Sequence, residues 1–72
     1  MEKTSIAKSF GARVKELRKT QGISQEDLAH RCMLDRTYIS GIERSIKNPS
    51  LNALETIAKG FGITVGELFK DL

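Results

Sequence analysis

Residues 24–44, with the sequence SQEDLAHRCMLDRTYISGIER, carry two helix starts with so little chain between them that only a tight turn can join the helices. Ser24 is a preferred N-cap residue, and Asp27 completes a near capping box. Asp35 is a second N-cap residue. Apolar residues flank both starts at the spacing of a hydrophobic staple, which fixes the angle at which the chain enters a helix. The pattern predicts two short helices, and every other element must pack around them.

Helix start and stop signals of the same kind divide the rest of the chain into three more helices. An apolar stripe with spacings of four, four and three predicts a first helix that ends at Gly22. The loop SIKNPS follows the third helix, because Pro49 bars its continuation and Ser50 can cap a fourth. This fourth helix ends near residues 60–62, where two glycines lie.

The fifth helix begins at a capping box formed by Thr64 and Glu67. No strand alternation or sequence repeat occurs, so we predict an all-α fold of five helices in a single domain over residues 1–72. The residues expected on the buried helix faces are Ile6, Phe10, Val14, Leu17, Leu28, Ala29, Cys32, Ile39, Ile42, Leu51, Leu54, Ile57, Ala58, Phe61, Val65, Leu68, Phe69 and Leu72.

A chain of 72 residues can bury only a small core, so self-association into a homodimer is expected to add stability. Its 39% hydrophobic and 29% charged residues are typical of a soluble globular protein. No apolar run approaches the roughly 20 residues that cross a bilayer, and the N-terminus MEKTSIAKSF lacks the apolar segment of a signal peptide. The single cysteine, Cys32, is compatible with a reducing compartment. These features predict a cytoplasmic protein with no membrane partner.

The net charge of +3 and the pI near 9.3 favour polyanionic partners, but the excess of bases does not lie in the central helix pair. Between residues 24 and 48, the bases Arg31, Arg36, Arg44 and Lys47 are matched in number by the acids Glu26, Asp27, Asp35 and Glu43. The acids lie mostly at predicted helix starts, where they complement the helix dipole. The placement of charge, and not its total, must therefore identify the partner.

The outward side of the third helix is polar and free of apolar bulk. At roughly 100° per residue, Ile39 and Ile42 set the inward direction of this helix. The opposite side holds Thr37 and Arg44, flanked by Ser40 and Gly41, with Arg36 at the edge. Such a face suits the major groove of DNA, where Arg can bond guanine and Thr or Ser can bond several base edges, whereas the alternative is an ordinary solvated surface. Gly41 is expected to be exposed, at a helix-propensity cost of roughly 1 kcal/mol that close approach to DNA would explain.

The segment SQEDLA, followed after a short turn by DRTYISGIERSIKNPSLNAL, resembles the lambda-repressor and Cro-like helix-turn-helix family over almost the whole chain. Within that family it looks most like the controller proteins of restriction-modification systems, which are small, dimeric and autoregulatory. The resemblance implies a lambda-repressor-like domain whose second and third helices form the helix-turn-helix. It also implies a transcriptional regulator that binds a pseudo-palindromic, double-stranded DNA operator as a homodimer, with two third helices in successive major grooves roughly 34 Å apart.

The resemblance implies a set of DNA-binding residues. The base-reading positions fall on Arg36, Thr37 and Tyr38, with Ser40 and Gly41 one turn on. Gln25 would bond the phosphate backbone, and Lys47 and Asn48 would approach the backbone and minor groove. Arg44 completes the outward face. The direction of Tyr38 equally fits a core edge, a phosphate contact or a base contact. Arg18 and Glu43 match an ion pair that ties the first helix to the third in relatives. Met33 replaces the Gly or Asn common in the turn, and a left-handed conformation there would cost roughly 1 to 2 kcal/mol.

His30 and Cys32 are the candidates for a metal or catalytic site. Two residues so close on one helix do not converge on an ion, and no second pair exists in the sequence. The same geometry argues against a Cys nucleophile with a His base. We expect an exposed His30 and a buried Cys32, with no metal, no cofactor and no enzymatic activity. A membrane-surface role for the lysines of the first helix is disfavoured, because Glu16 interrupts them.

Two alternative functions stay open on the sequence alone. The nearer is a phage-type repressor, and the other is an antitoxin or protein-interaction module of the same fold. The sequence also leaves open the operator sequence, the choice between activation and repression, and contact with RNA polymerase. The dimer surface is expected on the fourth and fifth helices, at Phe61, Ile63, Val65, Phe69 and Leu72.

Overall fold

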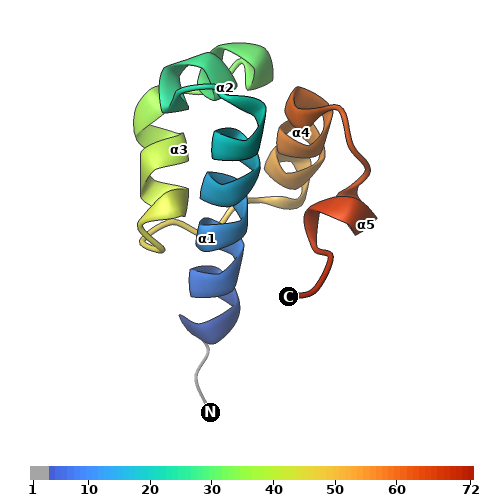
Figure 1. The fold of residues 1–72 in the computed structure, drawn as a ribbon. Coiled ribbons are helices and arrows are strands. Elements are labelled where there is room, and N and C mark those ends of the chain that lie inside the picture. Colours follow the sequence, from blue (N-terminus) through green and yellow to red (C-terminus); the bar gives the residue numbers. More distant parts are fainter. Residues whose placement is uncertain (1–3) are drawn as a thin grey trace.

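The computed structural model describes residues 4–72, which form five helices (Figure 1). These helices are α1 (Thr4–Gln21), α2 (Gln25–Cys32), α3 (Arg36–Glu43), α4 (Leu51–Phe61) and α5 (Val65–Leu68). No strand occurs within residues 4–72, and the predicted all-α fold is confirmed. Residues 1–3 of the predicted domain lie outside the described residues. None of the described helices combines the length and the apolar character that a bilayer span requires.

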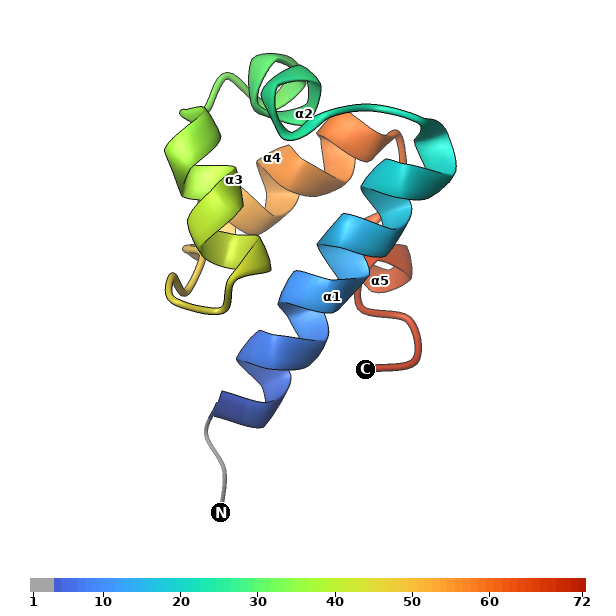
Figure 2. The ribbon, with the colours of Figure 1, turned by 60° about the vertical axis from the view of Figure 1, so that its left-hand side comes forward.

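Helix α3 lies at the left edge of the molecule in both ribbon views, and α5 lies on the side opposite α3 (Figures 1 and 2). Helices α1 and α2 both pack against α3, α4 packs against α2, and α5 packs against α4. In Figure 2, α2 crosses one end of α3 and leaves the length of α3 open on its outer side. The fold therefore presents one side of α3 that no other described helix covers.

The predicted capping boxes are present at the starts of α2 and α5. At α2, the Asp27 backbone N donates to Ser24 Oγ at 3.0 Å, and the Ser24 backbone N donates to Asp27 Oδ2 at 3.0 Å. These hydrogen bonds hold the pKa of Asp27 below its ordinary value. Thr64 and Glu67 repeat the arrangement, which likewise lowers the pKa of Glu67. Both boxes satisfy helix-start N–H groups that would otherwise lack partners.

The start of α3 differs from the prediction in one respect. Asp35 occupies the N-cap position, but its side chain makes no capping hydrogen bond. Its backbone carbonyl accepts the first hydrogen bonds of the helix, from the backbone N of Tyr38 at 3.0 Å and from that of Ile39 at 3.3 Å. The position of the helix start is therefore predicted correctly, whereas the role of the Asp35 carboxylate is not.

Every helix contributes to one small core. The residues of this buried cluster are Phe10, Val14, Leu28, Ala29, Cys32, Ile39, Ile42, Ile57, Ala58, Phe61 and Leu68. All of them were expected on buried faces, and burial raises the pKa of the Cys32 thiol. Gly22 and Gly62 end α1 and α4 at φ values of +69° and +75°, a left-handed conformation that glycine adopts without strain.

Four residues expected on buried faces are exposed: Ile6 (62%), Leu51 (84%), Val65 (39%) and Leu72 (45%). Ile6 and Leu51 lie near the starts of their helices, at the ends of the apolar stripes. Helix α5 ends at Leu68, so Leu72 does not continue its apolar face. Phe69, just beyond that end, stacks on Phe10 with 5.2 Å between ring centroids. The fifth helix is therefore shorter than its apolar pattern suggests.

Candidate nucleic-acid interface

The turn between α2 and α3 depends on Met33, which adopts the left-handed conformation at φ 56°. The Met33 backbone N donates to the His30 carbonyl at 3.2 Å, and the Leu34 backbone N donates to the Ala29 carbonyl at 2.9 Å. These bonds close the end of α2 in the way that a glycine usually does. The Met33 side chain is 91% exposed, so it adds little packing in return for the strained backbone.

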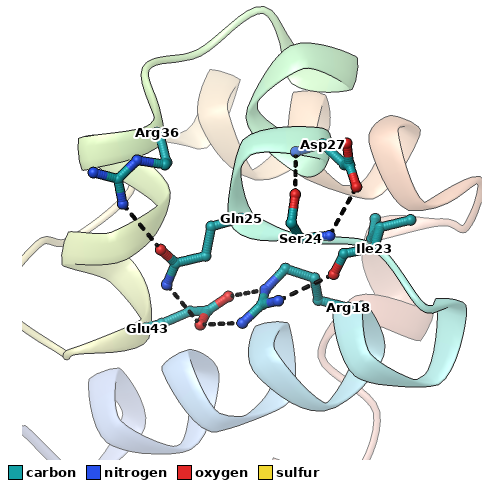
Figure 3. Close-up of polar contacts among 7 residues, drawn as sticks. All are labelled: Arg18, Ile23, Ser24, Gln25, Asp27, Arg36 and Glu43. Carbon is teal, nitrogen blue, oxygen red and sulfur yellow. Dashed lines mark hydrogen bonds and ion pairs between the residues drawn. The ribbon is translucent and has the colours of Figure 1, made fainter.

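Helix α3 is tied to α1 by the ion pair between Arg18 and Glu43 (Figure 3). Arg18 Nε donates to Glu43 Oε2 at 2.7 Å, and Arg18 Nη2 donates to Glu43 Oε1 at 3.0 Å. The third guanidinium nitrogen, Nη1, donates to the Ile23 carbonyl at 3.0 Å. The Glu43 side chain is only 4% exposed. Burial by itself raises the pKa of Glu43, but hydrogen bonds from Arg18 and Gln25 outweigh it and leave the pKa below its ordinary value.

Gln25 links this ion pair to the start of α3. Gln25 Nε2 donates to Glu43 Oε1 at 3.1 Å, and Gln25 Oε1 accepts from Arg36 Nη1 at 3.4 Å (Figure 3). An ionised carboxylate can only accept, so the amide must turn its nitrogen toward Glu43 and its oxygen toward Arg36. The buried carboxylate thereby sets the direction of the Gln25 amide. Sequence reasoning placed Gln25 at the helix start but missed this contact.

The eight predicted DNA-binding residues lie at the start of α2, on α3 and in the segment directly after α3. Among the eight residues predicted to bind DNA, Arg36, Thr37, Arg44, Lys47 and Asn48 are exposed, whereas Gln25, Tyr38 and Ser40 are half-buried. Tyr38 packs against the edge of the core. The Lys47 ammonium lies 5.8 Å from the centre of the Tyr38 ring, within cation–π range. Tyr38 therefore has a core-edge position and still reaches the loop that follows α3.

Gly41 does not have the exposed position that the helical wheel predicted. It is buried, because the loop after α3 folds back over it. The Gly41 carbonyl accepts from the backbone N of Ile46 at 2.9 Å and of Lys47 at 3.2 Å. An ideal Cβ on Gly41 would lie 2.8 Å from Lys47 Cγ, too close for a real contact. The glycine therefore accommodates this chain's own loop, and the predicted exposure of Gly41 is wrong.

Two of the four acids of the central segment make local contacts, whereas Glu26 and Asp35 are exposed. Asp27 is held in its capping box, and Glu43 is buried against Arg18. Arg31 turns toward α4, where it donates to the Gly60 carbonyl at 3.4 Å. The bases Arg36, Arg44 and Lys47 are exposed. The exposed acids Glu26, Asp27 and Asp35 lie at the starts of α2 and α3. The exposed bases Arg44 and Lys47 lie at and after the end of α3, so this part of the surface suits a polyanion.

The structure places His30 and Cys32 in different environments. His30 is exposed, whereas Cys32 is buried. Within residues 4–72, no group of three or more His, Cys, Asp or Glu side chains is arranged to hold a metal ion. The two side chains have the separate positions that the sequence predicted for them.

Comparison with known proteins gives consistent matches. The family model described as helix-turn-helix matches residues 14–68. The control protein C.MunI from a Mycoplasma species is 50% identical over 64 residues, which are 88% of this chain and 86% of C.MunI. The crystal structure of the restriction-modification controller protein C.AhdI from Aeromonas hydrophila has a TM-score of 0.86 and 41% identity, covering 89% of this chain and 97% of C.AhdI.

A third match is the controller protein C.Esp1396I, whose structure was solved as a tetramer in complex with its natural 35-base-pair operator. It has a TM-score of 0.85 and 39% identity, and the match covers 92% of this chain and 87% of C.Esp1396I. The chain therefore belongs to the helix-turn-helix family, and over most of its length it is similar to the controller proteins of restriction-modification systems.

Proposed function

We propose that this protein is a sequence-specific, double-stranded DNA-binding transcriptional regulator. Specifically, it is an autoregulatory controller of a restriction-modification system that binds a pseudo-palindromic operator as a homodimer. The observation that carries the proposal is the uncovered side of α3, which presents Arg36, Thr37 and Arg44 on a helix fixed to α1 and α2. The operator complex of C.Esp1396I supports the same choice of partner.

Within this function, the residues have separate roles. Arg36 and Thr37 read base edges in the major groove, where a guanidinium can fork onto guanine and a Thr methyl can contact the thymine methyl. Lys47 and Asn48 contact the backbone from the loop after α3. Gln25 orients Arg36 through the contact at 3.4 Å and is available to a phosphate at the start of α2. Tyr38, Ser40 and Arg44 complete the surface.

The proposed dimer surface is narrower than the sequence indicated. Phe61 is 4% exposed and belongs to the core, and Phe69 is occupied by Phe10. Val65 and Leu72 are the members of the predicted set with large exposed fractions. We therefore place the dimer contact around α5, centred on Val65. This surface lies away from α3 in Figures 1 and 2, so a partner there leaves the outer side of α3 open.

The proposed function also implies where in the cell the protein acts and that it is not a catalyst. A regulator that reads an operator by hydrogen bonds acts where the DNA lies, which is the cytoplasm of a bacterial cell. It performs no covalent chemistry and is not an enzyme. The homology to control proteins supports both statements.

Selection of bound duplexes from a random-sequence pool tests the proposed function. The purified protein is expected to enrich an inverted repeat whose half-sites lie about 10 base pairs apart, because two α3 helices related by a two-fold axis must enter successive major grooves. The same repeat should occur upstream of its own gene, beside genes for an endonuclease and a methyltransferase. Enrichment of no motif, or only of an asymmetric one, would reject operator binding as a dimer.

A further inference from the structure

The contact between Gly41 and Lys47 joins the recognition helix to the loop after it. Lys47 Cγ, Cβ and Cδ lie 2.8, 3.4 and 3.6 Å from the point where a Cβ on Gly41 would be. The aliphatic stem of Lys47 therefore lies across the backbone of α3. The Gly41 carbonyl also accepts the Lys47 backbone N. Side chain and backbone of Lys47 are thus held by the same glycine.

The end of the Lys47 side chain is held by a second residue of α3. Its Nζ lies 5.8 Å from the Tyr38 ring centre, and Tyr38 precedes Gly41 by one turn on the same helix. A cation above an aromatic face is attracted to the ring while its outer side stays in water. Both contacts are with α3, so the ammonium lies beside the helix that carries Arg36 and Thr37.

We infer that Gly41 is a positioning residue for DNA binding, because its missing side chain leaves a seat for the Lys47 stem. The Lys47 seat is defined here as the Gly41 backbone together with the Tyr38 ring. The Lys47 seat holds the ammonium beside α3, where it can contact a phosphate of the bound DNA. A lysine that is already ordered loses less conformational entropy on binding. This inference rests on the proposed function and deepens it, since it assigns a positioning role to a buried glycine of α3.

The test substitutes Gly41 by Ala. A Cβ at this position displaces Lys47, but Ala favours a helix more than Gly does, so the melting temperature should stay the same or rise. The slope of log affinity against log salt should fall by about one unit, as expected when one phosphate contact is lost. Affinity should fall by the same factor on the selected operator and on random duplex. Lys59→Ala is the control, because it removes an exposed lysine of α4, outside α3 and outside the proposed dimer surface around α5, and should leave the salt slope unchanged.

Lys47→Ala and the double variant Gly41→Ala/Lys47→Ala complete the comparison. If Gly41 acts through Lys47, each single variant and the double variant lose the same salt slope, because one contact cannot be lost twice. Independent, additive losses would overturn the inference. A Gly41→Ala protein that folds and keeps the wild-type salt slope would also overturn the inference.

Proton NMR of the free protein tests the Lys47 seat without DNA. Phenylalanine rings also produce ring-current shifts, and the chain has three of them, so the Tyr38→Leu variant identifies the part of the shift that comes from Tyr38. The ε-methylene protons of Lys47 should lie upfield of those of the other lysines, and Gly41→Ala or Tyr38→Leu should abolish that shift. Unshifted Lys47 protons in the wild-type protein would overturn the seat. Failure of the wild-type protein to bind any operator would instead reject the proposed function, and this spectrum would still decide the seat.

Discussion

Arg18 of α1 and Glu43 of α3 form a two-point ion pair, with Nε to Oε2 at 2.7 Å and Nη2 to Oε1 at 3.0 Å. The Glu43 side chain is 4% exposed and the Arg18 side chain 12%. Attraction between such buried charges offsets the cost of removing them from water only while both partners are present. The pair therefore fixes the orientation of α3 more than it adds net stability.

Removal of one partner should be costly. Arg18→Met keeps a long apolar stem but leaves the Glu43 carboxylate buried without its cation, so unfolding free energy should fall by about 3 kcal/mol. Urea denaturation at neutral pH measures the change. The double variant Arg18→Met/Glu43→Leu should lose less than Arg18→Met alone, since no unpaired charge remains. A single variant as stable as the wild type would contradict the role of the pair.

Stability should also fall in acid. The folded-state pKa values of Glu43 and Glu67 lie below the ordinary 4.5, and that of Asp27 lies below the ordinary 3.8. Above these ordinary values the groups are ionised in both states, and their contribution is complete. As the pH falls through 4.5 and toward the lower folded-state values, the unfolded chain takes up protons first, and stability is lost.

Urea denaturation at pH 7 and at pH 3.5 measures this loss. Glu67→Gln should reduce the difference, because one of the contributing groups no longer titrates. Equal stability of the wild-type protein at both pH values would contradict the assignment.

Met33→Gly should stabilise the protein. Met33 holds φ 56° and is 91% exposed, so glycine removes the left-handed strain and sacrifices almost no packing. We expect a gain of about 1 kcal/mol in unfolding free energy, with DNA binding unchanged. Met33→Ala keeps the Cβ and serves as the control without a gain. A loss of stability in the glycine variant would show that the Met33 side chain contributes more than its exposure indicates.

Val65→Asp should dissociate the dimer. The side chain is 39% exposed on α5, and a charge buried in an apolar contact between two copies has no partner. Sedimentation equilibrium should show a dimer for the wild type and a monomer for the variant at the same concentration, with the helical content unchanged. Cooperative operator binding should be lost together with the dimer. A wild-type monomer at high concentration would remove the basis for a two-fold symmetric operator.

The sequence predicts features whose partners lie within one helical turn. Ser24 pairs with Asp27, and Thr64 with Glu67, over three residues, so their capping boxes could be located from residue type and spacing. The contact between Gln25 and Glu43 spans 18 residues, and no local pattern indicates it. Such contacts depend on how the helices pack, which spacing alone does not determine.

Gly41 is a second residue whose surroundings depend on tertiary contacts that the sequence pattern does not indicate. A helical wheel treats every position opposite the core as solvent-exposed. Ser45, however, adopts a left-handed φ of 65° and donates from Oγ to the Ala7 carbonyl at 3.4 Å, and the chain from there folds back onto α3. Because the path of this loop depends on tertiary contacts, the sequence predicts an exposed Gly41 and does not indicate its contact with Lys47.

The claim that α3 reads the base sequence is tested most directly by the affinities of the wild-type protein and of Arg36→Ala for two duplexes. These are the selected operator and a scrambled sequence of equal length, at one salt concentration. Arg36 is assigned to base reading, so the variant should lose about 1 to 3 kcal/mol on the operator, relax the base preference at one position in each half-site, and bind the scrambled duplex like the wild type. Thr37→Ala should behave in the same way. Equal losses on both duplexes would contradict the claim that the outer side of α3 reads sequence.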